Sequence, residues 1–268
     1  MEFDEPYTNY WRSTVQNSID GTKIAGASEI RNYLRNLLIR RSDYVLDLGC
    51  SYGRMFELLA SYSDHVFGVD PETSALAHAR QFGYQGLLEG SAENTKMPSH
   101  FFDLVFSWAV FDVVNQIDGL KEVNRILKVG GTILFTGKND EYYPDDKLAF
   151  LAEKNAFLKG FPNRFTNLST MLKHLPQLGF ILKHLYLFPR RGDIGLGQFE
   201  VRTETKNTAL RGYEYLIICS KKSDIDYAQN LELGVLDMPS SRTAITLGQK
   251  KGYSDYRDYF ISLGLDQK

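Results

Sequence analysis

The sequence predicts an α/β fold built on a doubly wound, mostly parallel sheet of seven strands with helices on both faces. Three observations predict this class. Short, β-prone apolar runs alternate with longer runs of helical periodicity between residues 40 and 138. Glycine-bearing turns separate the two kinds of run at 49–53 and 130–131. Two further apolar runs, 181–188 and 213–220, complete the set of strands.

The elements of the first half follow in order. A helix is expected over 27–41, because its apolar residues recur at helical spacing and Arg40-Arg41 suit a helix C-terminus. The next strands are expected at 44–46, 65–70, 86–89, 102–107 and 132–136. Helices are expected between them after Gly53, from Pro71 to Arg80 and around 120–127.

The second half is less regular. A charged helix is expected at about 145–159, and another ends at Gly179 before the two late strands. In the tail, apolar residues from Tyr253 to Leu263 recur at helical spacing, which predicts a short amphipathic helix. We therefore divide the chain into an N-terminal helical or lid segment at 1–40, a core domain at 41–220 with inserts at 139–179 and 189–211, and a tail at 221–268.

Composition excludes several classes of protein. The 268 residues carry a formal net charge of −2, so no broad cationic field is available and DNA is not an expected partner. The two cysteines, Cys50 and Cys219, lack metal-ligand spacing, so no metal site is expected and a reducing cytoplasm fits best. The acidic, aromatic N-terminus differs from a secretory signal, and no run is long enough to span a membrane.

The turn after the first strand is the candidate ligand site. In doubly wound folds, ligands bind at the carboxyl ends of the strands, where the first strand leads into the first helix. Small residues at 49–53 allow a ligand to approach the backbone, but Asp47 would repel a diphosphate. Asp70 ends the second strand, at the position that accepts hydrogen bonds from a ribose diol. A cationic nucleoside fits this pair of acids.

These features resemble the class I S-adenosylmethionine-dependent methyltransferases. The resemblance covers about 40–138 and more loosely extends to 220; it implies that the last strand of the sheet is antiparallel. Two residues depart from the family pattern: Ser51 replaces a middle glycine, and Val129 replaces a proline. The matching motifs, in order, are Val45–Gly53, Val69-Asp70-Pro71, Glu89–Glu93, Phe102–Ser107 and Glu122–Gly131.

The resemblance implies a role for each matching residue with S-adenosylmethionine as the cofactor. Asp47 would lie near its amino-acid end, above a loop shaped by Gly49, Ser51 and Gly53. Asp70, followed by Pro71, would hold the ribose hydroxyls. The remaining cofactor contacts would be the adenine neighbours Ala92 and Glu93, the sulfonium neighbours Ser107 and Trp108, and Tyr10 of the N-terminal lid.

The catalytic residues are less clear from the sequence. Asp112 follows the fourth strand, where many relatives present a base, although an aspartate with an ordinary pKa of about 3.9 is a poor one. His174 lies in the region of the acceptor, and His184 is an alternative base. Each of these residues could instead have a purely structural role, Asp112 at the start of a helix and the histidines at the surface. Methyl transfer from a sulfonium also needs little acid–base help when the acceptor is well aligned.

The predicted function is methyl transfer to an oxygen or nitrogen atom of a small molecule. Arginines between the two late strands favour a sugar or nucleotide-sugar: Arg190, Arg191, Arg202 and Arg211. Methylation of RNA or protein, and a non-catalytic, S-adenosylmethionine-binding regulatory protein, stay open. A nicotinamide-dependent oxidoreductase is disfavoured by the glycine spacing and by Asp47. The apolar face of the tail helix leaves a homodimer open.

Overall fold

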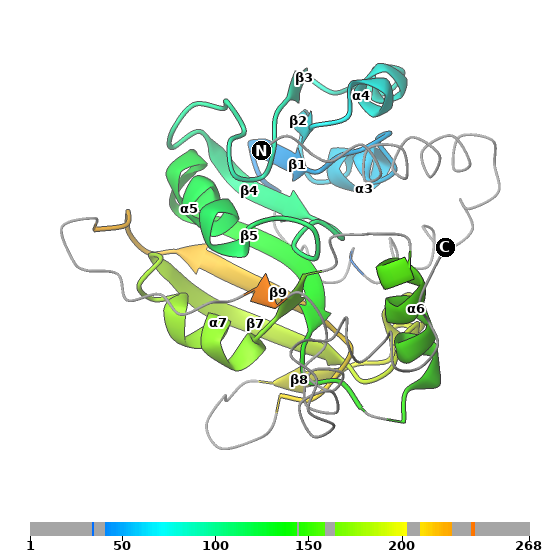
Figure 1. Ribbon diagram of the computed structural model, residues 1–268. Coiled ribbons are helices and arrows are strands. Elements are labelled where there is room, and N and C mark those ends of the chain that lie inside the picture. The colour runs from blue at the N-terminus through cyan, green and yellow to red at the C-terminus, as the bar shows by residue number, and fades with distance from the viewer. Residues whose placement is uncertain are drawn as a thin grey trace.

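The computed structural model describes residues 34, 41–143, 145–158, 164–202, 210–226 and 237–238. Three expectations lie outside these residues: the body of the helix at 27–41, the amphipathic helix at 253–263 and the position of Tyr10. The described residues form one mixed sheet with helices packed on its two faces (Figure 1).

The strands of the sheet have the order β3-β2-β1-β4-β5-β9-β7-β8. Strands β1 to β5 pair in parallel, and β9 runs antiparallel between β5 and β7. The predicted parallel sheet with an antiparallel last strand is therefore confirmed. The bounds are β1 Tyr44–Leu48, β2 His65–Asp70, β3 Gly86–Glu89, β4 Phe102–Ser107, β5 Leu127–Asn139, β7 Phe180–Phe188 and β9 Glu214–Lys221.

Three short strands extend the predicted set within the described residues. They are β6 (Phe165–Thr166), which pairs with the end of β5, β8 (Glu200–Arg202) at the sheet edge and β10 (Asp237–Met238), which pairs with β6. Strand β5 also begins earlier than predicted, directly after a helix. Its register with β4 shifts between Leu127 and Thr132, where Gly130 has a φ of +85°. The turn expected at 130–131 is therefore an irregularity of register within β5.

The helices cover both faces of the sheet. Helices α5 (Gln116–Ile126) and α7 (Leu168–His174) lie along one face (Figure 1) and contribute to the larger core cluster, with residues such as Val123 and Met171. Helix α3 (Phe56–Ala60) packs its Leu58 and Leu59 into a second cluster with the opposite side chains of the strands. The other helices are α4 (Thr73–Ala79), α6 (Lys147–Leu158) and α8 (Asp193–Leu196).

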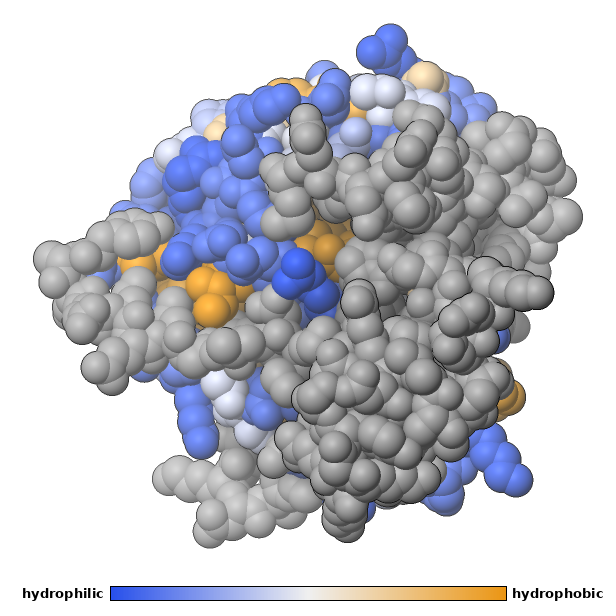
Figure 2. All heavy atoms as spheres, in the orientation of Figure 1, coloured by the Kyte–Doolittle hydropathy of each residue, from blue (hydrophilic) through white to orange (hydrophobic). Residues whose placement is uncertain are grey.

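Successive side chains of each strand point to opposite faces of the sheet, which explains the two core clusters. In β4, Val105 belongs to the larger cluster, whereas Leu104 and Phe106 belong to the other. The outer surface over α5 and the loop before β4 is mostly hydrophilic in the view of Figure 2, as expected for the solvent side of these elements. Among the described residues, no helix is long and apolar enough to cross a membrane.

Candidate functional site

The loop between β1 and α3 has a backbone that requires small residues. Gly49, Ser51 and Gly53 have φ values of +75°, +49° and +87°. A Cβ atom on Gly49 would lie 2.3 Å from Cγ2 of Val110, and one on Gly53 would lie 2.7 Å from the ring of Phe82. Ser51 therefore adopts a left-handed conformation that glycine takes more easily, which explains why its position usually carries glycine in the family it resembles.

Asp70 connects this loop to the start of α4. Its Oδ2 atom accepts a hydrogen bond from the backbone N–H of Ser51 at 2.9 Å, and its Oδ1 atom accepts one from the N–H of Glu72, also at 2.9 Å. The residue is only 9% exposed. Burial raises the pKa of its carboxyl to about 6, although the two backbone hydrogen bonds oppose the shift. Asp70 thus holds the loop and Pro71 in place.

Asp47 is the second buried acid of this site. It is 2% exposed, and its Oδ2 atom accepts a hydrogen bond of 2.8 Å from the hydroxyl of Tyr84. Burial raises the pKa of Asp47 to about 7; the hydrogen bond from Tyr84 and the positive charge of Arg54 oppose the shift. A cationic ligand beside this carboxyl would favour its ionised form. Sequence reasoning missed Tyr84, because its role depends on a contact across 37 residues.

The two acids lie on neighbouring strands and near the same edge of the sheet. In the register of β1 and β2, Asp47 is level with Gly68, so Asp70 lies two residues nearer the carboxyl edge. Residues two apart point to the same face of a strand. The structure therefore brings together Asp47, Asp70 and the loop at 49–53, as the sequence predicts.

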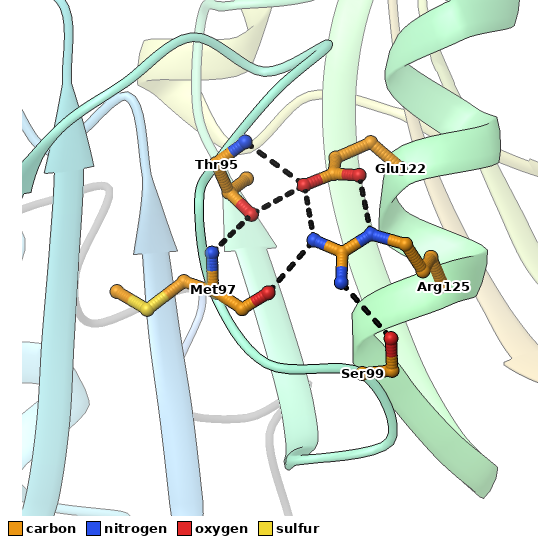
Figure 3. A network of polar contacts seen from close by, with 5 residues as sticks. All are labelled: Thr95, Met97, Ser99, Glu122 and Arg125. Atoms are coloured by element: carbon orange, nitrogen blue, oxygen red, sulfur yellow. Dashed lines mark hydrogen bonds and ion pairs between the residues drawn. The ribbon is translucent and has the colours of Figure 1, made fainter.

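A polar network fixes the loop that carries Ala92 and Glu93. Figure 3 shows the side chains of Glu122 and Arg125 pointing from α5 toward this loop. Glu122 accepts hydrogen bonds from the N–H of Thr95 at 2.9 Å and from Arg125 at 2.7 and 2.8 Å. Arg125 also donates to the carbonyl of Met97 at 2.8 Å. These bonds lower the pKa of Glu122, although burial opposes the shift.

Ala92 and Glu93 lie at the other end of the same loop. Ala92 is buried, and Oε1 of Glu93 accepts a hydrogen bond of 2.8 Å from the backbone N–H of Asn115, the N-cap residue of α5. The Oε2 atom of Glu93 is buried and has no hydrogen-bond partner in the described structure. This oxygen is free to accept a hydrogen bond from a ligand.

Ser107 and Trp108 lie where β4 ends, one strand away from Asp47. The side chain of Ser107 is fully buried, and its Oγ atom lacks a partner among the described residues. The ring of Trp108 stacks on Phe106 with 6.2 Å between centroids and belongs to a core cluster. The side chain of Trp108 therefore serves mainly as core.

A cluster of charged residues lies beyond β4, and sequence reasoning missed most of it. The Nζ atom of Lys138 lies 3.4 Å from Oδ2 of Asp112 and 3.6 Å from Oε1 of Glu153. The hydroxyl of Tyr213 donates a hydrogen bond to Glu153, and Lys138 is level with Glu214 across the β5–β9 pair. The signal available in the sequence was a charged residue at one terminus of each of two apolar strands: Lys138 near the end of β5 and Glu214 at the start of β9.

The structure does not bring His174 to this edge. Helix α7 starts after β6, at the carboxyl end of β5, and leads to Phe180, which pairs with Lys221 at the opposite edge. His174 is in the last turn of α7, so it lies toward the amino edge of the sheet. His184 lies in the middle of β7 on an exposed position, also away from the acids.

The arginines proposed to bind an acceptor already have partners. Arg190 forms two hydrogen bonds with Asp145, at 2.7 and 3.0 Å. Arg202 pairs with Glu200 at 2.6 Å, and Arg191 donates to the hydroxyl of Tyr213 at 3.2 Å. The guanidinium of Arg211 lies over the ring of Tyr143. Among the described residues, these arginines therefore do not form a ready phosphate site.

This combination of fold and site defines a class I methyltransferase fold with a buried acid on each of the first two strands. Residues 46–135 match a family model described as a methyltransferase domain. A solved S-adenosylmethionine-dependent methyltransferase of Thermotoga maritima has a similar fold, with a TM-score of 0.59 and 22% identity over 81% of this chain and 98% of that chain.

Two curated proteins are also similar in sequence. An uncharacterized methyltransferase of Schizosaccharomyces pombe is 28% identical over 38% of this chain and 42% of its own length. A protein of Mycolicibacterium smegmatis, called a probable S-adenosylmethionine-dependent methyltransferase, is 25% identical over 51% of each chain. These matches span about half, or less, of the length of the curated relatives.

Residues 46–135 therefore form a methyltransferase domain, and S-adenosylmethionine is the cofactor that its similar proteins are named for. The site fits this cofactor, because Asp47 and Asp70 supply two buried carboxylates for a cationic nucleoside beside the loop at 49–53. The described residues contain no group of three or more potential metal ligands.

Proposed function

We propose that this chain transfers the methyl group of S-adenosylmethionine to an oxygen or nitrogen atom of a small molecule. The observation that carries the proposal is the placement of Asp47 and Asp70 on adjacent strands around the loop at 49–53. Asp47 would lie near the ammonium group at the amino-acid end of the cofactor, and Asp70 would hold the ribose hydroxyls. Ala92 and Glu93 would border the adenine, and Ser107 and Trp108 would place their backbone near the sulfonium.

The work of the protein is then mainly alignment. The cofactor supplies an activated methyl group, and a fixed approach of acceptor, methyl carbon and sulfur accounts for much of the rate. The buried acids support this role, because two groups held by backbone and phenol hydrogen bonds lose little further freedom when a ligand binds.

A small acceptor is favoured over RNA by the balanced charge of the chain, which has 31 basic and 33 acidic residues. The partnered arginines do not support the hypothesis of a nucleotide-sugar acceptor. A sugar without a phosphate group is compatible with the site. Two buried free thiols, Cys50 and Cys219, fit a cytoplasmic protein. The hypothesis of a homodimer depends on the tail helix outside the described residues.

Transfer of a labelled methyl group tests this proposal. The purified chain is incubated with methyl-labelled S-adenosylmethionine and with separate fractions of a cell lysate that contain small molecules, RNA or protein. We expect label in the small-molecule fraction. Label confined to RNA or protein would favour the alternative enzymes, and cofactor binding without transfer to any fraction would favour a regulatory protein.

A further inference from the structure

Side chains from several elements converge on Lys138 at the carboxyl edge of the sheet. Asp112 comes from the segment after β4, Glu153 from α6 and Glu214 from the start of β9, which runs antiparallel and therefore begins at this edge. Asp112 and Lys138 have side chains that are 16% and 15% exposed, so the cluster lies at the surface of the core. It adjoins the end of β4, on the side where the proposed cofactor would present its methyl group.

Most polar atoms of the cluster have partners. Lys138 lies within 4 Å of both Asp112 and Glu153, and Glu153 also accepts a hydrogen bond from Tyr213. These contacts account for one oxygen of Asp112 and one of Glu153. They give the cluster a structural function, since they join α6 to the sheet.

Two carboxylate oxygens are left over. Oδ1 of Asp112 and Oε2 of Glu214 are buried and have no hydrogen-bond partner in the part of the chain that the structure describes. Buried acceptors without partners are rare in native proteins, because each loses its hydration without compensation. Both unpaired atoms here are acceptors, so a ligand that satisfies them must bring N–H or O–H groups.

We infer that Asp112 and Glu214 bind the N–H or O–H groups of the methyl acceptor, which is an amine or an uncharged polyol and carries no phosphate or carboxylate at that end. This inference rests on the proposed function and adds the chemical class of its substrate. An anionic end would face three carboxyl groups, of Asp112, Glu153 and Glu214, against two cations, Lys138 and Arg191, and would leave both unpaired oxygens without a donor.

The same arrangement provides a destination for the proton of the acceptor. During transfer, the acceptor nitrogen or oxygen forms a bond to the methyl carbon, the bond from carbon to sulfur breaks with its electron pair going to sulfur, and the acceptor proton passes to a carboxylate. Burial raises the pKa of Glu214 to about 7, although the charge of Lys138 opposes the shift. A carboxylate of this kind accepts a proton near neutral pH.

A cell extract from which proteins and other macromolecules have been removed serves as the source of acceptors. The full chain is incubated with deuteromethyl-labelled S-adenosylmethionine and this extract, and labelled products are separated by ion exchange before mass spectrometry. Label on the cation exchanger indicates an amine, and label in the flow-through indicates a polyol; either supports the inference. Label confined to products that bind the anion exchanger through a phosphate or carboxylate next to the methylated atom overturns it.

Matched variants connect the product to the cluster. For the labelled acceptor, we expect Glu214→Gln and Asp112→Asn to raise KM about tenfold or more, as for a lost charge-assisted hydrogen bond. Their affinity for S-adenosylhomocysteine should stay within about twofold, because neither residue contacts the proposed cofactor site. The control is Asp145→Asn, which removes an exposed ion pair with Arg190.

The outcomes separate this inference from the proposed function. An unchanged KM in both variants, with normal melting temperatures, overturns the inference alone and leaves the cluster as a structural ion-pair network. No labelled product in any fraction counts against the proposed function, and the inference fails with it. Binding of S-adenosylhomocysteine, measured on the same samples, shows whether the cofactor site itself is intact.

Discussion

Tyr84 donates a hydrogen bond of 2.8 Å from its hydroxyl to Oδ2 of Asp47, the most deeply buried acid of the candidate cofactor site. The bond joins the segment before β3 to the end of β1. It also gives a buried carboxylate one of the donors that it needs, so it stabilises the form of Asp47 that would bind a cation.

Replacing Tyr84 with phenylalanine tests this relationship. The loss of the hydroxyl should raise the pKa of Asp47 further and weaken binding of S-adenosylmethionine at pH 7 by ~3–10-fold, equivalent to one ordinary hydrogen bond, because Tyr84 acts on the ligand only through Asp47. Tyr44→Phe, at the other end of β1, is the control. Isothermal calorimetry measures both, and equal affinities in the two variants would contradict a role for Tyr84.

Binding of the cofactor should depend on pH. The pKa of Asp47 is about 7 and that of Asp70 about 6, so both acids are largely protonated at pH 5 and ionised at pH 8 in the free protein. A cationic ligand favours the ionised forms, and its affinity should therefore fall as the pH decreases below about 7. Calorimetry between pH 5 and 8.5, in buffers of different ionisation enthalpy, should also detect proton release; affinity that rises toward acid pH is the opposite result.

The free protein should gain stability when Asp47 is replaced by asparagine. Burial raises the pKa of Asp47 from its ordinary value of 3.8 to about 7, so folding disfavours its ionised form and stability decreases as the pH rises from about 4 to 7. Asp47→Asn removes this cost and should increase the free energy of unfolding at pH 8 by ~1–4 kcal/mol, at 1.36 kcal/mol per pKa unit.

The gain should nearly disappear at pH 3, where Asp47 is mostly protonated in both the folded and the unfolded state. Urea unfolding at the two pH values measures it. The same variant should bind the cofactor less tightly, so stability and function change in opposite directions. A variant that is destabilised at pH 8 would show that Asp47 is instead held in a favourable ionised state.

Ser51 can be tested through its backbone conformation. Its φ of +49° suits glycine and disfavours a β-branched residue. Ser51→Gly should keep cofactor affinity, whereas Ser51→Val should lose ~1–2 kcal/mol of stability and reduce affinity, because valine resists the left-handed conformation. Thermal melting with and without S-adenosylhomocysteine distinguishes the two, and similar behaviour of both variants would contradict a strained loop.

The network around Glu122 should support the adenine side of the site. Arg125→Met removes the hydrogen bonds to Glu122 and Met97 and should cost ~1–3 kcal/mol of stability. It should also weaken binding of S-adenosylhomocysteine. Lys121→Met removes an ordinary ion pair with Asp118 on the same helix and should change neither quantity appreciably. Equal effects of the two substitutions would argue against the network.

The sheet was predictable because its strands are short and apolar and its turns contain glycine. Local pattern was enough to place β1, β2 and β4, and the two acids near the carboxyl ends of β1 and β2. The network of Figure 3 and the bond from Tyr84 to Asp47 were not predictable, because each joins two segments that lie 26 or more positions apart and leaves no periodic signal.

The acceptor side was the least predictable part. Asp112 was identified by its position after β4, but its neighbours Lys138 and Glu214 meet only because β9 inserts next to β5. His174 was expected near the acceptor because of its region of the chain and its chemistry, and the direction of α7 carries it toward the opposite edge. For both Asp112 and His174, the residue type suggested a catalytic role, and the topology of the sheet determined how close each residue lies to the proposed site.

The most direct measurement is a calorimetric titration of the purified chain, its Asp47→Asn and its Asp70→Asn variants with S-adenosylhomocysteine at pH 8. We predict saturable binding to the unsubstituted chain and ~10–150-fold weaker binding to Asp70→Asn, equivalent to a hydrogen bond to a charged group. Asp47→Asn should also bind more weakly. No heat of binding to the unsubstituted chain at millimolar ligand, or unchanged affinity in both variants, would contradict the assignment of these two acids to the cofactor.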